Sequence, residues 1–106
     1  MVARGEIWRV NLDPTLGSEI RKSRPCVVVS PPEIHDHMRT VIIAPMTSKG
    51  RPAPFRVAVT HGGVTGLILL DQMRAVDKTR LTEKMGAVPA KTLAATLKTL
   101  QEVFAE

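Results

Sequence analysis

Two short segments carry the residues best suited to chemistry on a phosphate. Arg24 precedes Pro25 at the start of an apolar run, and proline biases the preceding residue toward an extended backbone. Arg24 is therefore expected at the mouth of a buried strand, where its guanidinium offers a planar fork of donors to a phosphate. Residues 46–49 (MTSK) leave a second apolar run with two hydroxyls and a cation. Taken singly, each has a plainer interpretation: a salt bridge from Arg24 to Glu19 or Asp71, and a polar strand end.

Metal binding and nucleophilic catalysis receive little support from the sequence. His35 and His37 form a close pair with no cysteine beside them, whereas structural zinc needs four nitrogen or sulfur ligands at suitable spacing. We therefore expect no metal and no cofactor, and we interpret this pair as exposed histidines at a helix end. Cys26 lies inside an apolar run, where a thiol is usually an inert small hydrophobe. A ribonuclease-type histidine pair would need His61 to meet His35 or His37, which we do not expect.

The composition describes an ordinary globular chain with a basic balance. Its 106 residues fit one domain, and its 43% apolar and 24% charged residues exclude a disordered tail or a fibrous repeat. Fifteen Lys and Arg against ten Asp and Glu give a formal charge of +5, which points weakly to a polyanionic partner. No acidic residue lies between Asp36 and Asp71, whereas four basic residues do: Arg39, Lys49, Arg51 and Arg56. The plainer interpretation is a solvated, slightly basic surface.

The sequence pattern predicts neither a membrane span nor a signal peptide. No apolar run approaches the ~20 residues of a membrane span, and charges interrupt the N-terminal residues 4–13, so no signal peptide is expected. The single cysteine excludes an internal disulfide. A reducing cytoplasm is the expected compartment.

The elements that must position these residues are mainly strands. Short apolar runs end at Gly, Pro or Asp, and they predict strands at residues 6–12, 25–30, 39–46, 55–60, 64–70 and 73–76. Ser30 followed by prolines predicts a short helix near residues 31–37 with a serine cap. A second helix is predicted near residues 89–104, from an apolar stripe of Leu93, Leu97, Leu100 and Phe104. Five or more short strands with a closing helix indicate a small, curled β-sheet or barrel.

Two polar segments, residues 13–24 and 47–54, lack secondary-structure periodicity. Loops held on a rigid sheet are where binding and catalytic groups usually lie, so we expect both to contribute to a site. Trp8 could be a stacking platform for a base. With aromatics at only 3% of the chain, a lone tryptophan beside Ile7 in a strand is better interpreted as core.

Taken together, these segments resemble the MazF/PemK/Kid family of toxin endoribonucleases from bacterial toxin–antitoxin pairs. The matching segments cover essentially the whole chain in the family's order. They are residues 4–8 (RGEIW), 12–15 (LDPT), 17–19 (GSE), Arg24-Pro25 with 26–31, 45–48 (PMTS), Gly66 ahead of Asp71-Gln72, and Gly86-x-Val88-Pro89.

The resemblance implies that residues 1–106 form a single toxin domain, an SH3-like β-barrel with a C-terminal helix, acting as a homodimer. It also implies metal-independent, sequence-selective cleavage of single-stranded RNA, leaving a 2′,3′-cyclic phosphate and a 5′-hydroxyl. The implied inhibitor is an acidic protein antitoxin, through which alone the toxin would contact operator DNA. The family's catalytic pair matches Arg24 and Thr47, and Glu19, Asp71 and Gln72 match positions that line the same site.

One branch of the family departs from this sequence. Some relatives carry histidine just before the glutamate and arginine two residues before the aspartate, where this chain has Ser18 and Leu69. A histidine-assisted mechanism therefore does not transfer. Arg24 is suited to stabilising a phosphorane and Thr47 to orienting the phosphate, and Glu19 is the candidate base. The residues expected to line the RNA groove are Lys22, Ser48, Lys49, Arg51 and Arg74.

Two functions of other classes remain open at this point. The first is a gyrase-directed toxin of the CcdB type, which shares the barrel and uses an aromatic-containing C-terminal tail, whereas this chain ends in residues 103–106 (VFAE). The second is a non-catalytic RNA- or protein-binding SH3-like module. An RNA cleavage assay separates all three.

Overall fold

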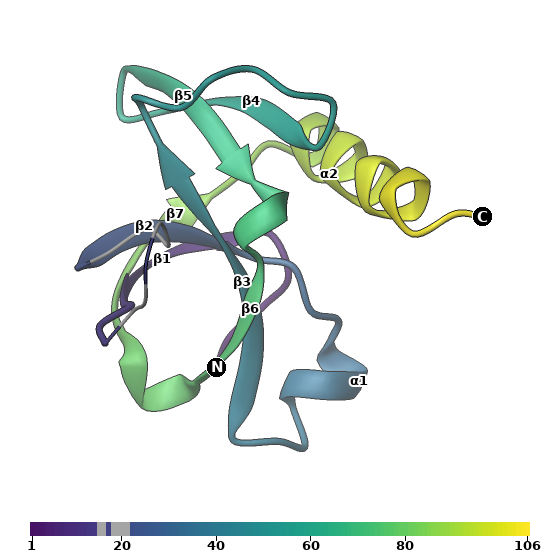
Figure 1. Ribbon diagram of the computed structural model, residues 1–106. Helices are drawn as coiled ribbons and strands as arrows, with labels where there is room; N and C mark the ends of the chain where they lie inside the picture. Colours follow the sequence, from purple (N-terminus) through teal and green to yellow (C-terminus); the bar gives the residue numbers. More distant parts are fainter. Residues whose placement is uncertain (15–16, 18–21) are drawn as a thin grey trace.

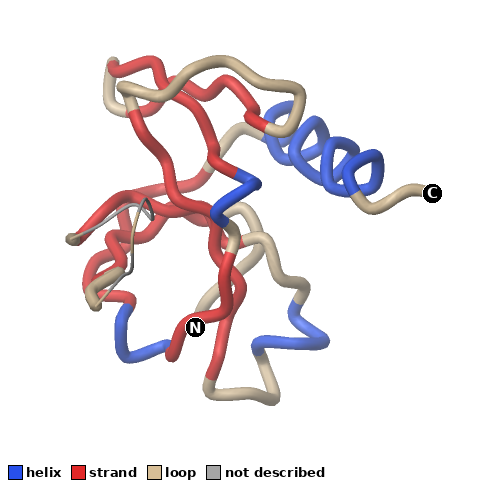
Figure 2. Tube along the Cα trace, in the orientation of Figure 1, coloured by secondary structure: helices blue, strands red, loops and turns tan. Residues whose placement is uncertain are grey.

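A strongly curled antiparallel sheet forms most of the fold (Figures 1 and 2). The computed structural model describes residues 1–14, 17 and 22–106. The strand order is β4-β5-β3-β2-β1-β7, with β6 also paired to β3. The strands are β1 (Glu6–Asn11), β2 (Ser23–Val28), β3 (Thr40–Thr47), β4 (Arg56–His61), β5 (Val64–Leu69), β6 (Arg74–Asp77) and β7 (Leu81–Ala87). The helices are α1 (Pro32–His35), α2 (Ala90–Val103) and the 3₁₀ turns η1 (Leu70–Gln72) and η2 (Lys78–Arg80). The predicted mainly β, curled architecture with a C-terminal helix is confirmed.

Strand β3 is the longest of these strands and joins the two halves of the sheet. Its first half pairs with β6, from Thr40 opposite Asp77 to Ile43 opposite Arg74. Its last two residues pair instead with β5, so that Thr47 lies opposite Leu67. The β4–β5 hairpin therefore begins where β3 ends, and Figure 1 shows it rising above the rest of the sheet beside α2.

The core lies on both faces of β2. Because side chains alternate along a strand, Val27 enters one apolar cluster while Cys26 and Val28 enter another. The first cluster contains Ile7, Val27, Val29, Ala44, Met46, Val59, Ile68, Leu70 and Val88. The second contains Val10, Leu12, Cys26, Val28, Val41, Ile43 and Val76, with Trp8 packed against it. Burial raises the pKa of the Cys26 thiol to about 12, which agrees with the prediction of an inert cysteine.

Two predictions about the C-terminal third were wrong or incomplete. Strand β7 was not predicted, because its sequence LTEKMGA is largely exposed and lacks an apolar alternation. Among the described strands, it pairs with β1 alone. The helix α2 ends at Val103, and Phe104 follows as its C-cap with 72% of its surface exposed. Phe104 is therefore not part of the buried stripe. Thr96 is the fully buried residue of this helix, and its hydroxyl donates to the Thr92 carbonyl at 2.8 Å.

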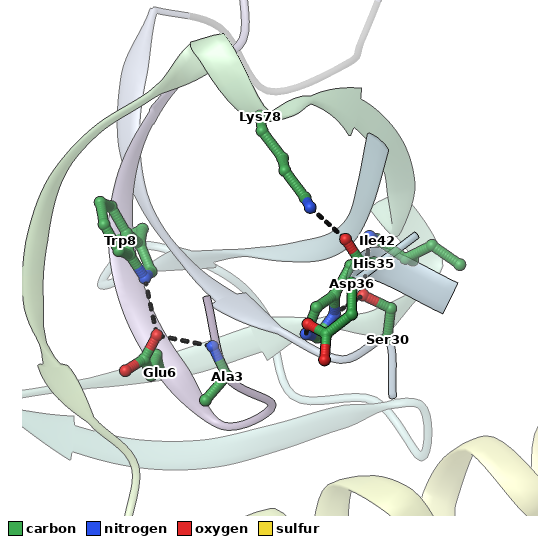
Figure 3. A network of polar contacts seen from close by, with 8 residues as sticks. All are labelled: Ala3, Glu6, Trp8, Ser30, His35, Asp36, Ile42 and Lys78. Atoms are coloured by element: carbon green, nitrogen blue, oxygen red, sulfur yellow. Dashed lines mark hydrogen bonds and ion pairs between the residues drawn. The ribbon is translucent and has the colours of Figure 1, made fainter. Parts of the chain in front are cut away.

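The short helix α1 also differs from its prediction. It spans four residues, and Pro31 rather than Ser30 is its N-cap. The Ser30 hydroxyl is instead held inside, 2.9 Å from Nδ1 of His35 and accepting the Ile42 amide at 3.1 Å (Figure 3). His35 is completely buried, so its interpretation as an exposed histidine was wrong. The Lys78 ammonium donates to the His35 carbonyl, and these contacts tie α1 to the sheet.

We expect Ser30→Ala to lower the free energy of unfolding by about 1–3 kcal/mol, because it removes the partner of the buried His35 Nδ1 and of the part-buried Ile42 amide. Urea denaturation monitored by Trp8 fluorescence measures this change. The matched control is Ser23→Ala at an exposed position of β2, which should stay within ~0.5 kcal/mol of the wild type. Equal losses in the two variants would contradict a structural role for the Ser30 hydroxyl.

Candidate active site

The two residues expected to act together, Arg24 and Thr47, lie on adjacent strands. In the antiparallel pairing of β2 with β3, Cys26 lies opposite Pro45. Two residues further along the same register, Arg24 comes opposite Thr47, and the period of two places both on one face. Both line one pocket of about 360 Å³. The sheet register thus brings together a guanidinium and a hydroxyl that are 23 positions apart in the chain.

Three parts of the fold build this pocket. Strands β2 and β3, with the residue after β3, supply a cation and two hydroxyls, the β4–β5 hairpin supplies mostly apolar side chains, and β7 supplies a methionine. The lining residues are Arg24, Pro25, Met46, Thr47, Ser48, Val59, His61, Gly62, Val64, Gly66 and Met85. A cationic, hydroxyl-bearing end beside an apolar remainder is suited to a ligand with an anionic group attached to a flat apolar one.

Close backbone packing fixes Thr47. A Cβ atom placed on Gly66 would lie 2.4 Å from the Thr47 carbonyl oxygen and 3.3 Å from the Ser48 Cα atom, so only glycine permits this approach of β5. The Thr47 hydroxyl oxygen accepts the Lys49 amide at 3.2 Å. This hydrogen bond orients the oxygen and leaves its own hydrogen available to a ligand.

The family model of the PemK-like, MazF-like toxin of type II toxin–antitoxin systems matches residues 3–104. The chain belongs to this family. It is 39% identical over 92 residues to endoribonuclease PemK of Escherichia coli, an alignment that covers 81% of this chain and 69% of the relative. It is 35% identical over 105 residues to endoribonuclease MazF9 of Mycobacterium tuberculosis, covering 89% and 88%.

Solved structures agree with this assignment. The crystal structure of MazF from Deinococcus radiodurans superposes with a TM-score of 0.83 at 29% identity, covering 96% of this chain and 94% of that one. A MazE–MazF structure from the same organism superposes with a TM-score of 0.78 at 26% identity, covering 98% and 95%. The family resemblance and the fold that it implied are therefore confirmed.

The structure places Asp71 on a partner other than Arg24. Arg56 is the first residue of β4 and lies opposite Leu69. Its guanidinium donates hydrogen bonds to both carboxylate oxygens of Asp71, at 3.0 and 3.1 Å. The hydrogen bonds from Arg56 hold the pKa of Asp71 below its usual range. The alternative pairing of Asp71 with Arg24 is therefore not the one observed. Asp71 and its neighbour Gln72 lie in η1, outside the pocket lining given above.

The predicted groove residues are spread more widely than the pocket. Ser48 lines the pocket, and Lys49 and Arg51 lie exposed on the loop that follows β3. Lys22 is exposed, with its amide donating to the Asp13 carboxylate at 3.0 Å. Arg74 donates instead to the Leu12 carbonyl at 3.2 Å, so its guanidinium anchors the chain after β1.

Two further predictions lie outside the described residues. Glu19, the candidate base, and Ser18, which replaces a histidine of some relatives, both belong to this part of the chain. Their roles stay predictions.

Sequence reasoning missed His61 as a member of the site. It ends β4 and lines the pocket with Arg24 and Thr47, whereas the buried His35 is on α1 and does not line it. The signal was present, because a period of two along β4 places His61 on the same face as Val59, which is buried.

Within residues 1–14, 17 and 22–106, no group of three or more His, Cys, Asp or Glu side chains could hold a metal ion. Over the same residues, no helix is long and apolar enough to cross a membrane.

Proposed function

We propose that this chain is an endoribonuclease toxin that cleaves single-stranded RNA in the pocket formed by Arg24 and Thr47. The observation that carries the proposal is the convergence of these two residues on one pocket, in a chain of the PemK-like, MazF-like family. Relatives at 39% and 35% identity are named endoribonucleases. Because 81% and 89% of the chain take part in these alignments, the proposal concerns the whole of residues 1–106 as one domain.

The proposed reaction uses a nucleophile that RNA itself supplies. The ribose 2′-oxygen loses its proton to a base and forms a bond to phosphorus, and the bond from phosphorus to the 5′-oxygen breaks. The departing 5′-oxygen takes up a proton, which leaves a 2′,3′-cyclic phosphate and a 5′-hydroxyl. Because the nucleophile belongs to the substrate, no metal-activated water is required.

Arg24 and Thr47 divide the work on the phosphate. A guanidinium is not deprotonated in proteins, so Arg24 acts by donating hydrogen bonds to the phosphorane oxygens as their charge develops. The Thr47 hydroxyl, already oriented by the Lys49 amide, donates to one of these oxygens. A hydroxyl is a poor acid near neutral pH, so Thr47 orients the phosphate and Glu19 is our candidate for the base.

We expect RNA binding to weaken with salt. The exposed cations Lys22, Lys49 and Arg51 lie on loops that follow or precede the strands of the pocket. If they and Arg24 contact about three to five phosphates, the logarithm of the binding constant falls against the logarithm of salt with a slope of about −2 to −3.5. Fluorescence anisotropy with a labelled 2′-O-methyl oligonucleotide measures the slope. A binding constant that stays the same from low to physiological salt would contradict this groove.

We further propose that an acidic antitoxin segment inhibits a homodimer of this chain, and that the toxin meets operator DNA only through that antitoxin. A MazE–MazF structure is among the similar structures, and the formal charge of +5 favours an acidic partner. A reducing cytoplasm fits a chain with one buried cysteine.

Titration with the acidic protein encoded beside this chain should abolish RNA cleavage at a fixed stoichiometry, because a disordered acidic segment folds over the basic groove. Residual activity is followed with a fluorescent RNA, and complex formation with light scattering. Full activity of a complex that forms would contradict this mode of inhibition.

The test of the proposed function is cleavage of a long single-stranded RNA in EDTA, with the new ends mapped and chemically identified. We expect cleavage at a few short sequences, with cyclic-phosphate and 5′-hydroxyl ends. A parallel assay of DNA supercoiling by gyrase tests the CcdB-type alternative. Intact RNA together with inhibited supercoiling would overturn the proposal, as would inactivity in both assays.

A further inference from the structure

His61 lines the same pocket as Arg24 and Thr47 but comes from another part of the sheet, the β4–β5 hairpin. It is the last residue of β4, paired across the hairpin with Val64, and it is half-buried. A Cβ atom placed on Gly86 would lie 3.3 Å from His61 Cε1. The imidazole of the hairpin therefore lies close to the backbone of β7 at Gly86.

The ring nitrogens of His61 are available to a ligand. Over residues 1–14, 17 and 22–106, neither nitrogen has a hydrogen-bond partner in the protein. A neutral imidazole presents one donor and one acceptor, so a ligand beside the ring can both accept from it and donate to it. Since His61 lines the pocket, such a ligand would lie inside it.

The surroundings of His61 fit a nucleobase better than another phosphate. Its neighbours on the hairpin and β7 walls are Val59, Val64 and Met85, which are apolar and carry no cation. A nucleobase has apolar faces and an edge of donors and acceptors. Because ribose links each base to its phosphate, a phosphate held by Arg24 and Thr47 brings the attached base into the same pocket.

We propose that His61 recognises the nucleobase next to the cleaved phosphate and sets the sequence preference at that position. This inference rests on the proposed endoribonuclease function. The imidazole donates to and accepts from the edge of the base, while Val64 and Met85 contact its faces. A base whose edge does not match leaves the His61 nitrogens unpaired, and the RNA bond beside that base is cleaved more slowly.

The experiment compares variants on a pool of single-stranded RNA with randomised sequence, whose cleavage sites are mapped by sequencing. For each preparation, the rates at the preferred site and at its single-base variants are expressed as a ratio. This ratio does not depend on the fraction of folded protein. The variants are His61→Ala and His61→Gln, and the matched control is His37→Ala, which removes an exposed histidine outside the pocket lining.

We expect His61→Ala to lower the ratio about tenfold at one position next to the cleaved bond and to leave the ratios at other positions unchanged. His61→Gln, which keeps a donor and an acceptor, should change the preferred base or retain part of the preference. His37→Ala should match the wild type. In His61→Ala, an unchanged preference at every position would overturn the proposal. So would an equal loss of cleavage on all sequences in both His61 variants, because that pattern indicates proton transfer. If the wild type leaves the pool intact, the proposed function itself fails.

Discussion

We expect Arg24→Lys to cleave single-stranded RNA about 100- to 1,000-fold more slowly than the wild type, the usual cost of losing one preorganised donor in a transition state. Lysine keeps the positive charge but loses the planar fork that grips two phosphate oxygens at once. The loss should fall mainly on the turnover number, because the fork matters most when charge develops on the phosphorane.

The control for this variant is a second arginine that has a purely structural contact. The Arg4 guanidinium donates to the Val29 carbonyl at 3.1 Å and does not line the pocket. Arg4→Lys should therefore lower the melting temperature and leave the turnover number near that of the wild type. Both quantities are measured on the same preparations. If Arg24→Lys melts normally and cleaves at a near wild-type rate, the assignment of Arg24 to the phosphate is wrong. If it is destabilised but active, its role is structural.

A comparably large loss is expected from Gly66→Ala, although Gly66 carries no chemistry. The added methyl group would lie 2.4 Å from the Thr47 carbonyl oxygen, so β5 and the end of β3 must move apart. Overpacking of this kind costs about 1–3 kcal/mol of stability. It also displaces the Thr47 hydroxyl, and we expect cleavage to fall on the order of 100-fold.

A double-mutant cycle tests whether Gly66 acts through Thr47. Thr47→Ala removes the hydroxyl and should itself be severe, whereas Thr47→Ser keeps it and should be mild. In a protein without the Thr47 hydroxyl, Gly66→Ala has no hydroxyl to displace. Adding Gly66→Ala to Thr47→Ala should therefore lower the turnover number by less than about threefold. Chemical denaturation of the wild type, the two single variants Gly66→Ala and Thr47→Ala, and the double variant separates the loss of stability from the loss of turnover. The loss of stability caused by Gly66→Ala should appear with and without the Thr47 hydroxyl. Turnover losses that multiply fully in the double variant would show that the glycine acts elsewhere.

The fold was predictable where burial dominates the sequence. Runs such as residues 26–29 and 41–44 are β-branched or apolar at every position, and both lie at the centre of the sheet. The same reasoning failed at β7, because an edge strand with one neighbour does not need an alternating pattern. It also misassigned Ser30. A serine just before a helix that begins with proline has the sequence pattern of an N-cap, and this pattern does not show that the hydroxyl points into the core.

The site was predictable where its residues match a family pattern. Arg24 and Thr47 follow from the resemblance, and the β2–β3 pairing explains why they meet. The pairing of Asp71 with Arg56 could not be read from the sequence, because it depends on how β5 turns into η1 beside the start of β4. The period of two along β4 places His61 on the face of the buried Val59, but that this face lines the pocket of Arg24 and Thr47 follows only from the folded hairpin.

Methionine methyl NMR locates the proposed RNA site, the pocket of Arg24 and Thr47, without relying on catalysis. The chain has five methionines; Met46 and Met85 line the pocket, whereas Met1 and Met38 are exposed outside its lining. A single-stranded 2′-O-methyl oligonucleotide lacks the attacking hydroxyl and stays intact during the titration. We expect saturable shifts of the Met46 and Met85 methyl resonances and fixed Met1 and Met38 resonances. Binding that shifts Met1 or Met38 and leaves Met46 and Met85 unchanged would show that RNA binds elsewhere.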